Sequence, residues 1–163
     1  MEVVVAGRGT ERVALGATPE EIRAGLGAPP KIVEHLPLSY LYVYPDLGVE
    51  VDFVVPNGAA EVLFFFGDWG GHRAAAIATE DGLTFGAHRD EIVARWGPPA
   101  GSDVPHAYER RFHTGWLYYR QGIQFHLDQL ERLVIVAVMR PAAVVRPGPP
   151  SRPYAARSTR LGD

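Results

Sequence analysis

The chain of 163 residues contains no cysteine, which excludes disulfide bonds, thiolate metal sites and a cysteine nucleophile. It also lacks any apolar run near the roughly 18 residues that a membrane-spanning helix needs. The longest apolar runs, Val62–Phe66 and Leu133–Met139, have the length of strands. The first residues lack the basic lead-in of a secretory signal. We therefore expect a soluble, cytoplasmic protein that does not insert into a membrane.

Charge is sparse and unevenly distributed. The formal net charge is -3 at pH 7, and residues 140–163 hold five arginines against one aspartate. That tail thus carries +4 and residues 1–139 carry -7. Because an acidic body does not attract phosphates, we expect no nucleic-acid partner. The tail is rich in proline and poor in large apolar residues, which predicts a disordered or extended segment that could dock on a partner.

The motifs of common active sites are missing as well. The early Gly-Arg-Gly-Thr-Glu-Arg stretch has Arg12 where a dinucleotide fingerprint needs its third glycine. No serine lies in a Gly-x-Ser-x-Gly turn. None of the six histidines has the spacing of a helical zinc site, so only a site built from distant histidines stays open. We predict no catalytic residue, no cofactor and no metal.

One pattern occurs twice along the chain. Residues Gly16–Pro29 and Gly86–Pro99 share glycine, alanine, Glu-Ile and Gly-x-Pro at matching positions. The composition is 47% hydrophobic and 21% charged, as in ordinary globular domains. We therefore predict a single domain over residues 1–139, built from two repeats at about 10–67 and 80–139.

Each copy of the pattern predicts a short helix. Thr18 lies three residues before Glu21, the spacing of a capping box, and Pro19 suits the first helical position. Gly27 and Gly97 lie where a helix ends with a left-handed residue. The prolines that follow prevent the helix from continuing.

Strands are predicted after each helix. Asn57-Gly58 between apolar runs is a strong hairpin signal. An extra strand, Glu2–Ala6, is expected at an edge of the sheet. The fold class is α+β: two helix-plus-three-strand repeats form one antiparallel sheet with both helices packed on one face. The other predicted strands are Ser39–Tyr44, Gly48–Val55, Glu61–Phe66, Arg110–Arg120, Ile123–Leu127 and Leu133–Met139.

The repeated helix pattern followed by a three-stranded meander resembles the SmpA/OmlA (BamE-like) repeat. Two such units in tandem resemble the architecture of the β-lactamase inhibitory protein family. The matching residues are Gly16–Pro29 and Gly86–Pro99 with the strands after each. The resemblance implies an assembly factor, an inhibitor or a binding module rather than an enzyme.

Side chains alternate between the two faces of a strand, so polar and aromatic residues can be assigned to one face. Tyr, Trp and Arg are enriched in contact patches, although cross-strand aromatic pairs also stabilise an exposed sheet. Trp69 and His72, from the segment between the repeats, would rim the same face. The predicted partner-binding residues are Tyr40, Tyr42, Tyr44, Glu50, Asp52, Trp116, Tyr118, Arg120, Gln124 and His126.

The predicted function is a non-catalytic protein-binding or scaffold module whose partner is another protein. One alternative is an immunity or inhibitor protein that covers the active site of a toxin or enzyme. A second alternative is a small-ligand binder or enzyme that uses Glu50, Asp52 and His126, because carboxylates in different environments can divide acid and base roles. A pocket in which these three groups converge would favour the second alternative.

Overall fold

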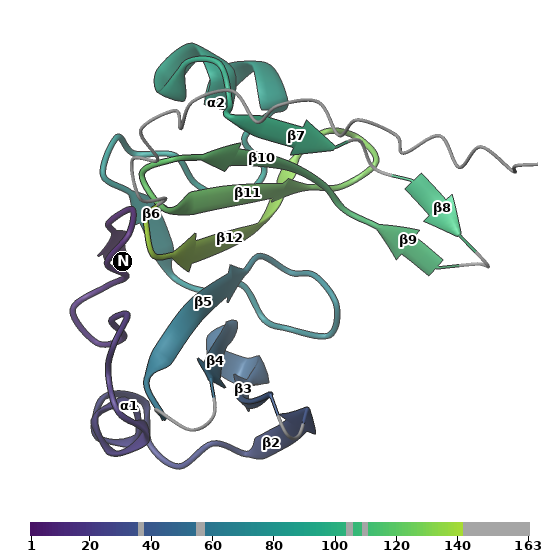
Figure 1. The fold of residues 1–163 in the computed structure, drawn as a ribbon. Helices are drawn as coiled ribbons and strands as arrows, with labels where there is room; N and C mark the ends of the chain where they lie inside the picture. Colours follow the sequence, from purple (N-terminus) through teal and green to yellow (C-terminus); the bar gives the residue numbers. More distant parts are fainter. Residues whose placement is uncertain (36–37, 55–57, 104–105, 109–110, 142–163) are drawn as a thin grey trace, which may run out of the picture.

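The computed structural model describes residues 1–35, 38–54, 58–103, 106–108 and 111–141. The fold is α+β, as predicted (Figure 1). The predicted tail lies almost wholly outside the described residues. The elements are β1 (Glu2–Val4), α1 (Pro19–Leu26), β2 (Lys31–His35), β3 (Ser39–Tyr44), the 3-10 turn η1 (Pro45–Leu47), β4 (Val49–Val54), β5 (Ala60–Phe66), β6 (Ile77–Thr79), α2 (Arg89–Trp96), β7 (Gly101–Asp103), β8 (His106–Tyr108), β9 (Arg111–His113), β10 (Gly115–Tyr119), β11 (Ile123–Leu127) and β12 (Leu133–Met139).

The helix α1 begins and ends at the predicted residues. The Thr18 hydroxyl accepts a hydrogen bond from the Glu21 N–H at 3.3 Å, and the Glu21 carboxylate accepts one from the Thr18 N–H at 2.7 Å. This is the predicted capping box. The helix ends at Gly27, whose φ of 88° lies in the left-handed region. Its fully buried residue is Ile22.

The helix α2 has a different N-terminal cap. The ring Nδ1 of His88 accepts a hydrogen bond from the Asp90 N–H at 3.3 Å. The helix ends at Gly97 with φ 75°, and it buries Ile92 completely. Among the described residues, neither helix is long and apolar enough to cross a membrane.

Eight strands form one antiparallel sheet in the order β2-β3-β4-β5-β12-β11-β10-β7. The central pair joins β5 to β12, with Phe65 opposite Val136. The two edge strands, β2 and β7, were not predicted. The prediction of three strands after each helix is therefore one fewer than the four that each half contributes to this sheet. β2 follows two prolines and lacks a clear alternation, and the sequence of β7, Gly-Ser-Asp, has no apolar residue.

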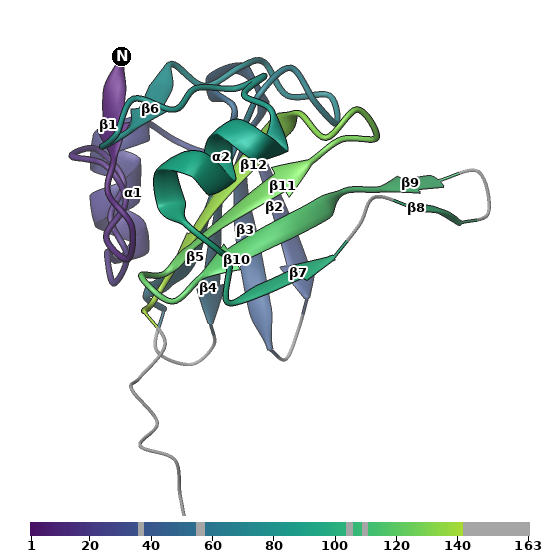
Figure 2. The same cartoon turned by 90° about the horizontal axis from the view of Figure 1, so that it is seen from above.

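Two small sheets lie outside the main one. β1 pairs in parallel with β6, Glu2 opposite Ile77, rather than at an edge of the large sheet as expected. β8 and β9 form a separate hairpin that projects beyond β7 and β10 (Figure 2). The predicted strand Arg110–Arg120 is therefore divided between β9 and β10.

The cross-strand register shows that both helices cover the same face of the sheet, here called the helix face. Directly opposite residues of neighbouring strands share a face. One such row crosses six strands from Tyr42 to Tyr119 through Val51, Leu63, Val138 and Ile123. Arg23 of α1 contacts the Tyr42 ring, and Trp96 of α2 contacts the Tyr119 ring. The helix face holds the core.

Candidate functional site

The outer face of the sheet, opposite the helices, carries a row of five mixed side chains. In cross-strand order they are Glu50, Phe64, Ala137, Gln124 and Tyr118. Ala137 is fully buried, whereas the other four are half-buried. A small residue at the centre of the row thus separates an acid on β4 from an aromatic ring on β10.

A second row lies beside the first. It begins with Phe66 on β5 and continues through Ile135, His126 and Trp116 to Asp103 on β7. His126 and Trp116 are half-buried. The four residues predicted on β10 and β11 therefore do share the outer face: Trp116, Tyr118, Gln124 and His126.

Three predicted residues lie on the wrong face. Tyr42 and Tyr44 are each 2% exposed, and the Tyr40 ring stacks on Phe53 at 5.0 Å between centroids. Tyr42 lies opposite Val51 on the helix face. The prediction that these tyrosines lie beside Glu50 and Asp52 is wrong. The alternating segment Ser-Tyr-Leu-Tyr-Val-Tyr is apolar on both of its faces, so its pattern alone does not select the buried one.

The tyrosine hydroxyls find partners on α1. The Tyr44 hydroxyl donates to the Gly27 carbonyl oxygen at 3.0 Å, and the Tyr42 hydroxyl accepts from the Arg23 guanidinium. Burial raises the pKa of the Tyr44 phenol. Tyr119, which was not among the predicted residues, makes the matching contact to the Gly97 carbonyl at 3.0 Å. Arg120 is exposed in the turn after β10, outside the strands.

His126 is a half-buried histidine that is neutral at pH 7. Its Nδ1 lies 3.0 Å from the Thr114 hydroxyl. Burial lowers its pKa to about 4, so the ring is uncharged at pH 7. Its Nε2 is buried and has no hydrogen-bond partner.

A second histidine reaches the outer face from the segment between β5 and β6. The His72 ring stacks on Phe66 with 3.9 Å between centroids, and its side chain is 9% exposed. Its Nε2 lies 3.0 Å from Oε1 of Glu50, without the orientation of a hydrogen bond, and its Nδ1 has no partner. The expectation that His72 lies at this face is consistent with these contacts.

Asp52 lies on the outer face opposite Leu41 and Val62, with Oδ1 buried and unpaired. Its strand, β4, is separated from the β11 strand of His126 by β5 and β12. Three inter-strand spacings amount to about 14 Å along the sheet. Asp52 and His126 are therefore too far apart to share a proton. Within the described residues, no three metal-ligating side chains gather.

A cavity of about 280 Å³ lies away from the outer face. Its lining includes Glu2, Arg12, Val49, Phe65 and Ile77. Arg12 and Glu2 form an ion pair at 3.1 Å, and the Arg12 guanidinium also donates to the Gly25 carbonyl at 3.1 Å. None of Glu50, Asp52 and His126 lines this cavity.

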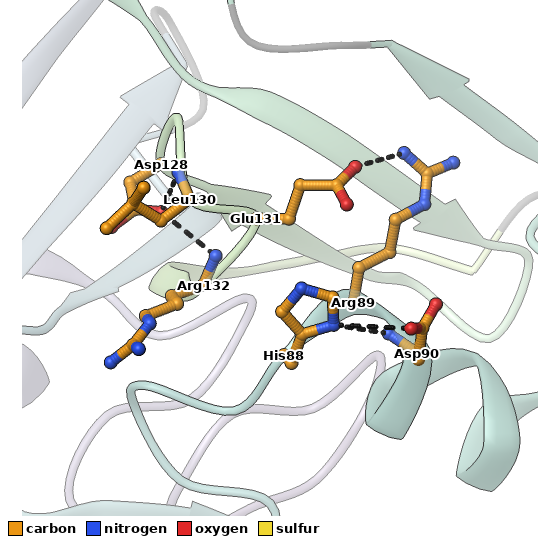
Figure 3. Close-up of polar contacts among 7 residues, drawn as sticks. All are labelled: His88, Arg89, Asp90, Asp128, Leu130, Glu131 and Arg132. Atoms are coloured by element: carbon orange, nitrogen blue, oxygen red, sulfur yellow. Dashed lines mark hydrogen bonds and ion pairs between the residues drawn. The ribbon is translucent and has the colours of Figure 1, made fainter.

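A cluster of polar contacts joins α2 to the turn between β11 and β12 (Figure 3). The Arg89 N–H donates to the Glu131 carbonyl at 2.9 Å, and the two side chains form an ion pair at 3.3 Å. Asp128 Oδ1 accepts from the N–H groups of Leu130 and Arg132 at 2.8 and 2.9 Å. Glu131 has φ 57°, a left-handed conformation that these contacts hold in place. Because they are internal, we assign the cluster a structural role.

Comparison with known proteins shows the fold and little more. No protein-family model and no curated protein matches the chain. A matching solved structure is that of an extracellular protein containing an SCP domain from Bacillus anthracis str. Ames, with 16% identity and a TM-score of 0.50. The match covers 77% of this chain and 44% of that one, so this chain corresponds to less than half of the other protein.

The predicted membership of the SmpA/OmlA (BamE-like) and β-lactamase inhibitory protein group is wrong. The short helix pattern that led to it encodes a cap, one buried isoleucine and a glycine stop, which describe a helix rather than a family. In its place, the chain shares its α+β fold with part of an extracellular SCP-domain protein.

Proposed function

We propose that the chain is a non-catalytic protein-binding module that uses the outer face of the sheet. The observation that carries this proposal is a group of half-buried aromatic and polar side chains that share that face on β10 and β11: Trp116, Tyr118, Gln124 and His126. Tyr and Trp are enriched where proteins contact one another, because each ring provides apolar area together with a polar group.

The charges and rings of the outer face suggest what the partner presents. Glu50 and Asp52 lie on β4, whereas Trp116 and Tyr118 lie on β10. Carboxylates favour Lys or Arg, and half-buried aromatic rings favour apolar or guanidinium groups. The proposed partner therefore places a cationic side chain against β4 and an apolar one against β10.

We also propose that the two halves of the sheet are a tandem repeat. Matching backbone hydrogen bonds support this. Ala60 of β5 bonds to the segment before α1, and Leu133 of β12 bonds to the segment before α2. The pairs are Gly16 N–H to Ala60 O (2.7 Å), Ala60 N–H to Ala17 O (2.9 Å), Gly86 N–H to Leu133 O (2.9 Å) and Leu133 N–H to Ala87 O (2.9 Å). The outer face would then combine one surface from each repeat.

The test begins with a photo-reactive amino acid at position 118 in the native host, which captures the bound protein. The affinity of that purified partner is then measured by calorimetry for the Trp116→Ala/Tyr118→Ala variant. We expect at least tenfold weaker binding, since central aromatic residues dominate interface energies. Leu130→Ala is the matched control, because Leu130 is 69% exposed at a turn outside the outer face.

Equal affinities of the outer-face variant and the control, with both variants folded by circular dichroism, would rule the proposal out. If the captured partner is an enzyme or toxin, assays of its activity distinguish an inhibitor from a scaffold. Fractionation of the same cells tests the predicted cytoplasmic location.

A further inference from the structure

We propose that the edge strand β2 binds an extended peptide of another protein as an added strand, with an apolar and a basic residue two positions apart entering the groove beside α1. β2 ends the strand order, and its strand partner among the described residues is β3. Alternate residues of an edge strand direct their backbone N–H and C=O groups away from the sheet. Such an edge is the template for strand addition. This inference goes beyond the proposed function, because it concerns a different part of the sheet.

A groove accompanies this open edge on the helix face. It has a volume of about 340 Å³ and lies between α1 and the strands β2 and β3. Ile32 is 51% exposed there, and Glu34 is exposed two residues later on the same face. The lining residues are Pro19, Glu20, Arg23, Ile32, Glu34, Tyr40 and Tyr42. A peptide paired with β2 would direct every second side chain into this groove.

The exposed side chains of β2 define the peptide. A residue opposite Ile32 gains most if it is apolar, because the two side chains cover one another. A residue opposite Glu34 gains most if it is Lys or Arg. Glu20 and Arg23 line the α1 side of the groove and lie 3.8 Å apart, so their opposite charges largely offset one another. Glu34 therefore leaves the groove with a net negative charge, which favours the same choice.

A second copy of the chain fits this edge poorly. A symmetric antiparallel pair centred on Val33 would place Ile32 opposite Glu34, with no opposite charge for the carboxylate. A pair centred on Glu34 would oppose two like charges, which is destabilising. A pair centred on Ile32 would bring Pro30, which has no N–H, into the hydrogen-bond ladder. A peptide with its own sequence has none of these conflicts.

The test uses the full chain and a labelled probe peptide, Thr-Ile-Thr-Lys-Thr-Ile-Thr, whose palindromic sequence serves either strand direction. Fluorescence anisotropy should show saturable binding. Glu34→Lys should weaken binding of this probe roughly fivefold and strengthen binding of a probe with Glu in place of Lys. Glu80→Lys, an identical charge change at an exposed residue far from β2 in the sequence, should leave the affinities of both probes unchanged. A probe with N-methylated alternate backbone nitrogens should not bind.

The proposal fails if no probe binds, if the two charge variants weaken binding equally, or if the N-methylated probe binds as well as the parent. Sedimentation of the chain alone completes the test. A dimer that the probe does not dissociate would assign the edge to a second copy. Displacement of the probe by a peptide of residues 142–163 would assign it to the chain's own terminus. Because the variants lie outside the outer face, failure here is separate from failure of the proposed function.

Discussion

Tyr44 and Tyr119 are the last residues of β3 and β10, and each donates its hydroxyl proton to the carbonyl of the glycine that ends a helix. The last carbonyls of a helix lack intrahelical partners, so a phenol suits them well. Under the proposed tandem repeat, these two tyrosines correspond to one another. They are 75 residues apart (119 − 44), whereas the two helix patterns begin 70 residues apart (86 − 16). The spacing between the two helix patterns does not hold for the strands, because the β8–β9 hairpin lengthens the connection between α2 and β10.

His126 is expected to make the stability of the protein depend on pH. Its pKa is about 4 in the folded chain and 6.5 when unperturbed. Between these values the unfolded state binds the proton and the folded state does not, so stability is full above pH 6.5 and falls toward pH 4. The loss attributable to His126 is about 3 kcal/mol. Urea unfolding at pH 7 and pH 4.5 measures it.

His126→Gln should flatten this pH dependence. His88→Asn is the matched control, since His88 is half-exposed and Asn also caps a helix. An NMR titration that places the His126 pKa near 6.5 would contradict the expectation directly.

At the scale of elements, both helices are only eight residues long, too short to be stable alone. Each depends on one fully buried isoleucine, Ile22 or Ile92. The cap, the stop and the apolar spacing are local signals, so the sequence predicted both helices well. β2 and β7 lack such signals, because an edge strand is defined by its neighbour rather than by its own pattern.

Ile22→Ala should destabilise the protein by about 2–5 kcal/mol, because it leaves a cavity between α1 and the sheet. Ile22→Val should cost only about 0.5–1.5 kcal/mol. Glu20→Ala, at an exposed position of the same helix, is the control and should change the free energy of unfolding by less than about 0.5 kcal/mol. Guanidinium unfolding followed by circular dichroism measures all three. An alanine variant as stable as the valine variant would show that α1 is not anchored at Ile22.

At the scale of the whole molecule, one core serves both halves. The buried cluster contains Ile22 and Ile92 together with Phe53 and Phe125, and β5 pairs with β12 across the middle of the sheet. The sequence predicted the single antiparallel sheet because its apolar runs are strand-sized. It did not predict the face of β3, where aromatic and aliphatic residues alternate. For the residues of the candidate site, the predicted sheet face agrees with the structure on β10 and β11 and disagrees on β3.

Because the core is shared, we expect the two halves to unfold together. Val136→Ala, at the central pair, should lower the free energy of unfolding by about 1–3 kcal/mol. Native-state hydrogen exchange should show the same decrease for slowly exchanging amides of β3 and β10. A decrease confined to β10 to β12 would mean that the halves unfold separately.

The central pairing also has a consequence for synthesis. β5 is complete early, but its neighbour β12 is the last strand of the sheet among the described residues. At typical elongation rates the ribosome needs roughly four to fifteen seconds to pass from one to the other. Throughout that interval, the edge of β5 that later pairs with β12 has no partner strand. Phe64 and Phe66 lie on one face of β5, and Phe65 lies on the other. The nascent chain is therefore most prone to aggregate during the translation of its second half, before its last strand covers this edge.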